Sequence, residues 1–199
     1  KPSRVMSDIE KKITAYHEAG HAIAAKVVDR SNIVHKISIV PRGRAGGFTM
    51  YLPEEDRMYM PKTDILNKII VMLAGRVAEQ LIIGDISTGA SDDIKRATSL
   101  ARQMVMQYGM SDKIGPISYD EGGEVFIGRD FGHAKAYSEK IAADIDEEVK
   151  HILTEQYKKT EELLTEYMPI LKRVGEKLLE VETIDSHMFE ECFNKGIKE

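Results

Sequence analysis

Five consecutive residues, His17-Glu18-Ala19-Gly20-His21, combine two imidazoles with a carboxylate at a spacing that can bind a metal. Residues four apart on a helix share one face, so His17 and His21 can converge on one zinc ion. Zinc lowers the pKa of a bound water molecule to about 7, and Glu18 is placed to take up the proton. The pattern predicts a zinc-dependent peptidase with Zn²⁺ as cofactor, His17 and His21 as ligands and Glu18 as general base.

A catalytic zinc site also needs a third protein ligand and an open position for water. The metzincin pattern requires Gly and His further along the same helix, but Ala24 and Val27 stand there, so that class is excluded. Residue type and spacing leave five candidates for the third ligand: Glu79, Asp92, Asp93, His35 and His133.

Each candidate also has an ordinary structural role. Glu79 is an acid in an otherwise apolar segment; it could be the ligand, as in zincins with a Glu on a second helix, or an ion-pair partner of Arg76. Asp92 and Asp93 begin an expected helix, where carboxylates compensate the helix dipole. His35 and His133 fit ordinary surface positions. Spacing alone does not choose between them.

The composition limits the class of protein. The 199 residues fit one large domain or two small ones, and 42% apolar with 31% charged residues is typical of a folded chain. The net charge of −5 disfavours nucleic-acid binding. The longest apolar run, 69–74, is too short to span a membrane. The single cysteine, Cys192, permits no intrachain disulfide and is expected to be a packing residue in a reducing compartment.

The elements that must position these residues are mostly helical. A helix is expected over about 7–28, capped by Ser7 or Asp8, with Gly20 allowing another segment to approach closely. Strands expected over 35–40 and 48–52 would form a hairpin or part of a small sheet. Further helices are expected over 64–83 and 91–108, short extended segments at 117–119 and 125–127, and helices over 134–167, over 169–179 and after 183–186. The fold class is therefore mostly α with a small β-sheet.

Several segments, in order along nearly the whole chain, resemble the peptidase domain of the FtsH family, the membrane-anchored, ATP-dependent zinc proteases. The resemblance implies an HExxH zincin-like helical peptidase domain over 1–199, with a catalytic part over about 1–132 and a C-terminal helical part over about 133–199. The matching segments are 14–22, 39–45, 74–79, 87–94, 124–128 and 182–185.

The resemblance implies roles for particular residues. The third zinc ligand corresponds to Asp93, although the preceding position, usually Asn in the family, is Asp92 here. Glu79 would then be a hydrogen-bond partner that orients a ligating histidine. A strand edge formed by Gly47, Phe48, Thr49 and Met50 would hold an extended substrate by β-augmentation.

The resemblance also implies partners beyond this chain. The sequence has no phosphate-binding loop of the Gly-x-x-x-x-Gly-Lys-Ser/Thr type, so an ATPase module and a membrane anchor are expected upstream. The expected assembly is a homo-hexamer at the cytoplasmic face of the bacterial inner membrane, with this fragment itself soluble. It would degrade unfolded or damaged membrane and soluble proteins as an ATP-dependent zinc metalloendopeptidase.

Two alternatives come from other classes of protein. The metal site could be structural, within an oligomerisation or binding module, although such a site has no need of Glu18. The chain could also be an α-helical interaction domain without metal. Metal analysis separates these alternatives from the peptidase.

Overall fold

The histidine pair lies on the first helix, α1 (Asp8–Val28), in a computed structural model that describes residues 5–120 and 137–195. Ser7 caps the helix as predicted, because its hydroxyl accepts a hydrogen bond from the backbone N–H of Glu10 at 3.3 Å. The elements that follow are β1 (Asn32–Ser38), β2 (Phe48–Pro53), α2 (Lys62–Ile83), the 3₁₀ turn η1 (Thr88–Ala90), α3 (Ser91–Met106), α4 (Glu139–Glu166), α5 (Met168–Val181), β3 (Thr183–Asp185) and α6 (Ser186–Asn194).

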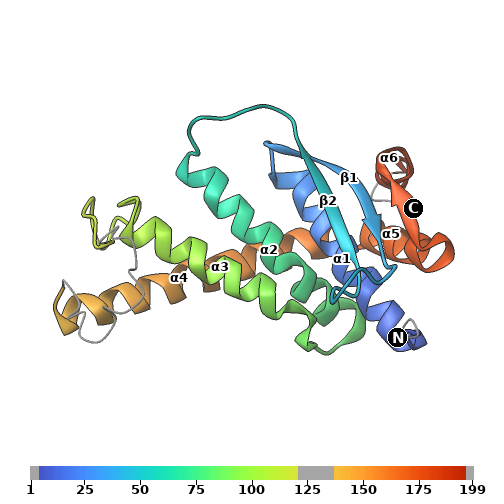
Figure 1. Ribbon diagram of the computed structural model, residues 1–199, viewed down its shortest axis with the longest axis horizontal. Coiled ribbons are helices and arrows are strands. Elements are labelled where there is room, and N and C mark those ends of the chain that lie inside the picture. The colour runs from blue at the N-terminus through green and yellow to red at the C-terminus, as the bar shows by residue number, and fades with distance from the viewer. Residues whose placement is uncertain (1–4, 121–136, 196–199) are drawn as a thin grey trace.

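The close pairing of α1 with α2 brings the residues of the site together (Figure 1). Gly20 of α1 makes it possible: a Cβ atom there would lie 2.5 Å from the carbonyl oxygen of Ala74 and 2.6 Å from the Cβ of Ala78. Real Cβ atoms do not come so close, so a side chain at position 20 would push the helices apart. The close approach expected at Gly20 is therefore made by the backbone of α2.

The three antiparallel strands lie in the order β2-β1-β3. Ile37 of β1 pairs with Thr49 on one side and with Ile184 on the other, and both isoleucines are fully buried. The hairpin was predicted, whereas β3 was not. Its three residues are too few for a periodic signal, and the strand forms only because it meets a partner about 145 residues earlier in the chain.

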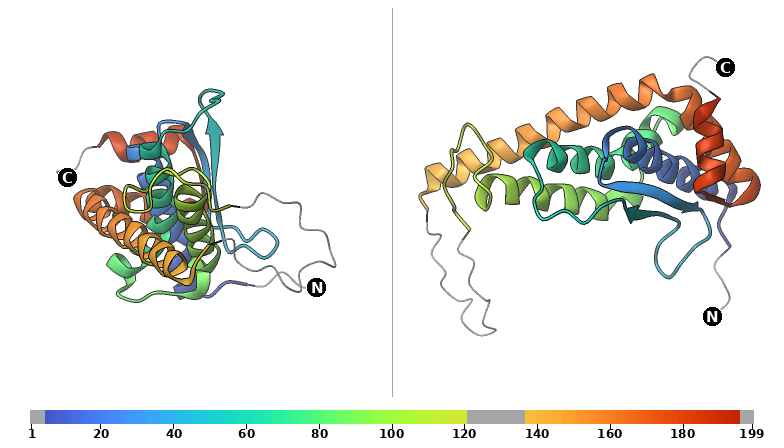
Figure 2. Two further views of the ribbon diagram at one scale, coloured as in Figure 1. Left: turned by 90° about the vertical axis from the view of Figure 1, so that its left-hand side faces the viewer. Right: turned by 90° about the horizontal axis from the view of Figure 1, so that it is seen from above.

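Two apolar clusters hold the described part of the chain. One joins α1, α2, the sheet, the end of α4, α5 and α6, and Cys192 packs against it as expected. The other joins α2, α3 and α4, and α4 runs along α2 and α3 as a long outer helix (Figure 2). The predicted mostly α fold with a small sheet is confirmed. Among the described helices, none has the length and apolarity needed to cross a bilayer.

Two elements expected in the second half of the chain, the extended segment 117–119 and the helix from 134, lie next to undescribed residues. Residues 117–119 form no strand with the described sheet; instead the N–H of Tyr119 donates to the carbonyl of Met106 at the end of α3. The helix expected from 134 begins at Glu139 in the described residues, after Ser138, whose hydroxyl accepts from the N–H of Ile141. The segment 125–127, the matching segment 124–128, His133 and the division near 132 lie outside the described residues.

Candidate metal centre

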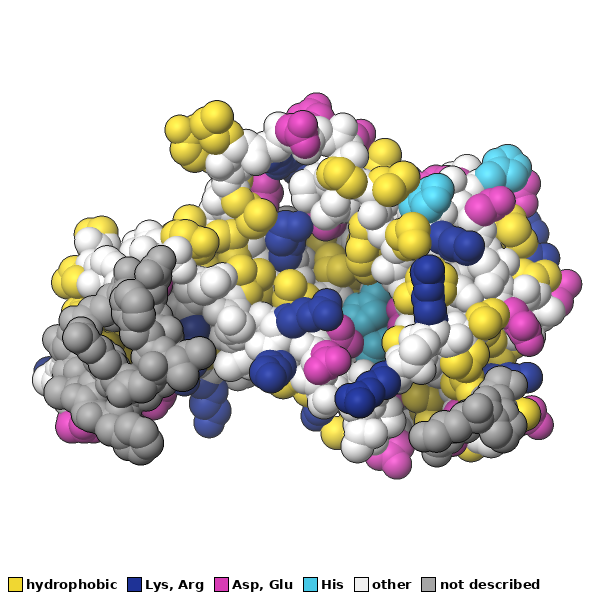
Figure 3. All heavy atoms as spheres, in the orientation of Figure 1, with side chains coloured by type: hydrophobic (Ala, Val, Ile, Leu, Met, Phe, Trp, Pro, Cys, Tyr) yellow, Lys and Arg dark blue, Asp and Glu magenta, His cyan; other side chains and the backbone are white. Residues whose placement is uncertain are grey.

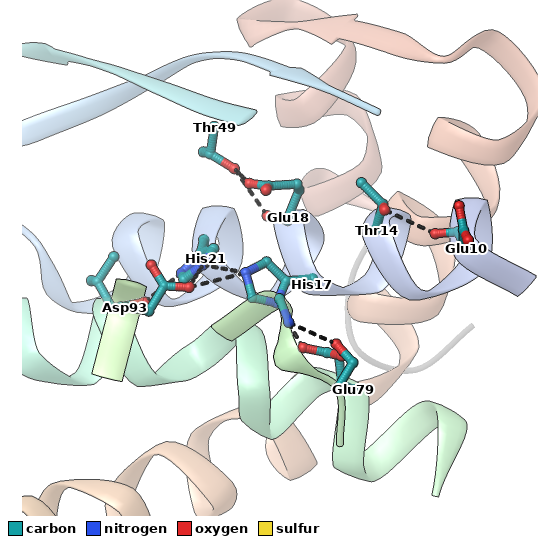
Figure 4. A network of polar contacts seen from close by, with 11 residues as sticks. Glu10, Thr14, His17, Glu18, His21, Thr49, Glu79 and Asp93 are labelled. Atoms are coloured by element: carbon teal, nitrogen blue, oxygen red, sulfur yellow. Dashed lines mark hydrogen bonds and ion pairs between the residues drawn. The ribbon is translucent and has the colours of Figure 1, made fainter. Parts of the chain in front are cut away.

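Helix α1 presents both imidazoles of the histidine pair to α2. His17 and His21 are 9% and 8% exposed, and their Nε2 atoms lie 3.0 Å apart (Figure 4). Gly75 of α2 leaves the space that they fill, because a Cβ there would lie 2.6 Å from Nε2 of either ring. The rings therefore occupy the place of a side chain on the facing helix.

The second nitrogen of each ring is held by α2. His17 Nδ1 lies 2.8 Å from Glu79 Oε2, and His21 Nδ1 lies 2.7 Å from the carbonyl oxygen of Val71. A carbonyl and an ionised carboxylate can only accept, so each Nδ1 carries the proton and donates it. In the neutral rings, both Nε2 atoms then offer a lone pair.

Asp93, in the first turn of α3, brings a third acceptor to the same point. Its Oδ2 lies 3.1 Å from His17 Nε2 and 3.2 Å from His21 Nε2. Tetrahedral ligands at zinc bond lengths of about 2.0–2.1 Å stand about 3.3 Å apart, so the spacing of these three atoms fits one zinc ion. They are the one group of potential metal ligands found among the described residues. Three acceptors without a donor require a cation or a proton.

Without metal, a proton lies between these acceptor atoms. Burial lowers the pKa of His17, but the hydrogen bonds to Asp93 and Glu79 and the charge of Glu18 outweigh it and raise the pKa to about 10. Burial raises the pKa of Asp93, but the hydrogen bonds and charges of both histidines bring it well below the usual range. The site favours positive charge, and a metal ion would replace this proton.

Glu79 is the buried acid behind His17. It is 1% exposed, and its other oxygen, Oε1, accepts from the Ser87 hydroxyl at 2.5 Å. Burial raises its pKa, but the hydrogen bonds from His17 and Ser87 lower it overall. Among the described residues Glu79 makes no ion pair with Arg76, so its partners are those expected of a carboxylate that orients a ligating histidine.

Glu18 points away from α2, toward the sheet. Its Oε2 accepts from the Thr49 hydroxyl at 2.6 Å, and Thr49 belongs to β2 (Figure 4). The side chain is 8% exposed and lies beside the histidine pair without joining the cluster of ligand atoms. A carboxylate held in this way next to the ligands can accept a proton from a water molecule in the site.

A cleft of about 670 Å³ opens over these residues between β2, α1 and α3. Figure 3 shows histidine side chains at the floor of this hollow, with lysine and arginine side chains around it. Of the expected substrate strand, Gly47, Phe48 and Thr49 line the cleft, whereas Met50 is not in its lining. Tyr51 lines it too, which the sequence did not suggest. Within the described sheet β2 has one neighbouring strand, β1, so its other edge is unpaired.

Asp92 and His35, two other candidates for the third ligand, stand apart from the ligand atoms. Asp92 is exposed in the cleft lining and forms no hydrogen bond or ion pair with the histidine pair, and His35 is exposed on β1. Sequence reasoning missed Gly75, the carbonyl of Val71 and Ser87. Of these, Gly75 alone could have been noticed in the sequence, because it is a glycine in the middle of an apolar helix.

Comparisons with known proteins show which sequences this chain resembles. The sequence model of peptidase family M41 matches residues 4–192. An "ATP-dependent zinc metalloprotease FtsH 1" of Thermoanaerobacter is 51% identical over 98% of this chain and 32% of its own length. An "ATP-dependent zinc metalloprotease FtsH" of Bacillus subtilis is 46% identical over 98% of this chain and 31% of its own. The chain thus spans about a third of the length of these curated relatives.

Proposed function

The chain belongs to peptidase family M41, and from this premise we propose that it hydrolyses peptide bonds of unfolded polypeptides with the help of a zinc ion. The observation that carries the proposal is the convergence of three acceptor atoms, from His17, His21 and Asp93, beside a separately held carboxylate. These three residues would hold the zinc. When bound, zinc supplies a Lewis acid that polarises a peptide carbonyl and makes a water molecule more acidic.

The chain's own residues would carry the proton. Glu18 takes a proton from the attacking water while the water oxygen forms a bond to the carbonyl carbon. Glu18 then returns that proton to the amine nitrogen as the C–N bond breaks. Thr49 holds the carboxylate in the orientation needed for both transfers. The unpaired edge of β2, which begins at Phe48, and Gly47 just before it would align the substrate through backbone hydrogen bonds, which suits broad sequence tolerance.

We further propose that this peptidase works within a larger protein. The relatives are named ATP-dependent proteases, and they extend well beyond the region matched here. An ATPase module would supply unfolded segments, in a homo-hexamer attached to the membrane by parts outside this chain. The division into a catalytic part and a C-terminal helical part near 132 is also a proposal.

The test is zinc content together with cleavage of an unfolded protein such as casein. We expect one zinc per chain, hydrolysis that stops with a chelator, and recovery when zinc is returned. Cleavage that continues unchanged after complete zinc removal would refute the proposal. A metal-free chain that never binds zinc would refute it as well.

A further inference from the structure

The turn between α2 and α3 contains a hydroxyl that contacts the metal centre through one intermediate residue. The Ser87 hydroxyl donates to Glu79 Oε1 at 2.5 Å, and Glu79 Oε2 accepts from His17 Nδ1 at 2.8 Å. We propose that Ser87 is a positioning residue that fixes His17 through Glu79 and so sets the zinc affinity of the site. This inference rests on the proposed function, because it concerns the same metal.

The direction of each hydrogen bond is determined by the groups involved. Glu79 is an ionised acceptor, so the single hydroxyl proton of Ser87 points to it. One lone pair of the same hydroxyl accepts from the backbone N–H of Gly89 at 3.1 Å. The hydroxyl therefore joins the carboxylate on α2 to the backbone of η1, the turn that leads directly into the helix of Asp93.

Burial makes this contact matter for His17. Glu79 is 1% exposed, so the described structure leaves little room for water to replace a lost donor. Without the Ser87 hydroxyl, Glu79 Oε1 would keep only the weaker contact with the backbone N–H of Ser87, and the carboxylate would be free to turn. That rotation would move Oε2 away from His17 Nδ1 and release the ring from its orientation. Partners that orient a ligating histidine in this way change metal affinity by about 10- to 100-fold.

The chain offers a matched control in the neighbouring residue. Thr88 also carries a hydroxyl in the same turn, but its side chain is exposed and makes no hydrogen bond within the described residues. Thr88→Ala therefore removes a hydroxyl of the same turn without touching Glu79. Ser87→Thr keeps the hydroxyl at an extended backbone position, φ −115°, that threonine adopts readily.

The experiment measures the zinc dissociation constant by chelator competition and the visible absorption of the cobalt-substituted protein. We expect Ser87→Ala to weaken zinc binding by about 10- to 100-fold and to change the cobalt spectrum. Ser87→Thr and Thr88→Ala should match the parent within about threefold. Thermal melts of the metal-free variants identify any that fail to fold.

A double-mutant cycle with Glu79→Met separates positioning from a general effect on the turn. If Ser87 acts through Glu79, Ser87→Ala should cost little further affinity once Glu79 is gone. An equal loss in both backgrounds, or parent-like affinity in Ser87→Ala, would overturn the inference. The proposed function fails separately, if the parent binds no zinc or if His17→Ala retains it.

Discussion

Adding one methyl group at Gly75 should strongly weaken metal binding without unfolding the protein. The Cβ of Gly75→Ala would lie 2.6 Å from Nε2 and Cε1 of His17 and 2.6 Å from Nε2 of His21. Ordinary contacts between such atoms are about 3.5–4.0 Å, so the rings must withdraw by about 1 Å. Metal ligands tolerate errors of only about 0.2 Å, so this displacement is several times too large.

The rings have no easy way to withdraw. His17 and His21 are tied to α2 through bonds of 2.8 and 2.7 Å to Glu79 and Val71, and a 1 Å shift would break both. We therefore expect zinc affinity to fall at least 100-fold, which corresponds to about 2.7 kcal/mol. Overpacking costs about 1–3 kcal/mol of stability, and replacing glycine in a helix returns about 1 kcal/mol. The metal-free fold should thus lose at most about 2 kcal/mol.

The assay compares zinc affinity with the thermal stability of the metal-free protein. Gly175→Ala is the control, because it also adds a methyl group in a helix against an aromatic ring, that of Tyr16, and not against a ligand. The control should lower stability and leave zinc affinity nearly unchanged. If Gly75→Ala kept parent-like zinc affinity, the histidine rings would not lie against α2 as described.

Three further predictions concern the ligands, the pH and the base. Asp93→Ala should lose zinc and Asp92→Ala should keep it; metal analysis showing the reverse would exchange their roles. Because the pKa of His17 is about 10 without metal, zinc must displace a proton near neutral pH. Affinity should therefore rise up to about tenfold per pH unit between pH 7 and 9 and level off near 10; a flat profile in chelator competition would contradict this. In the metal-free protein the stability from that proton is fully present below pH 6.5 and is lost as the pH rises through about 10. Thr49→Val should lower kcat about tenfold with zinc content unchanged, and Thr49→Ser should restore it; equal kcat in all three would show that Thr49 does not position Glu18.

The part of the site that the sequence predicted best is local in the chain. His17 and His21 share a helix face because of their spacing, so their convergence follows from helix geometry alone. Asp93 lies 72 residues beyond His21. No helical or strand periodicity in the sequence indicates that two residues so far apart will meet. Family resemblance selected Asp93, and in the structure its Oδ2 lies close to the Nε2 atoms of both histidines.

Contacts that depend on tertiary packing could not be predicted. The carbonyl of Val71 carries no sequence signal, since every residue has one, and it meets His21 only because Gly20 lets the helices approach. Thr49 was expected in the substrate strand, but its hydrogen bond to Glu18 depends on how the sheet lies over α1. The strand β3 exists for a similar reason, because β1 offers it an edge.

The most direct test of the central claim is the pair of measurements on Glu18→Gln. The amide has almost the shape of the carboxylate but cannot take a proton from water. The account predicts one zinc per chain with parent-like affinity, and casein cleavage reduced by about 10²- to 10⁴-fold. Cleavage at the parent rate by the zinc-loaded variant would show that Glu18 is not the base, and would contradict the account.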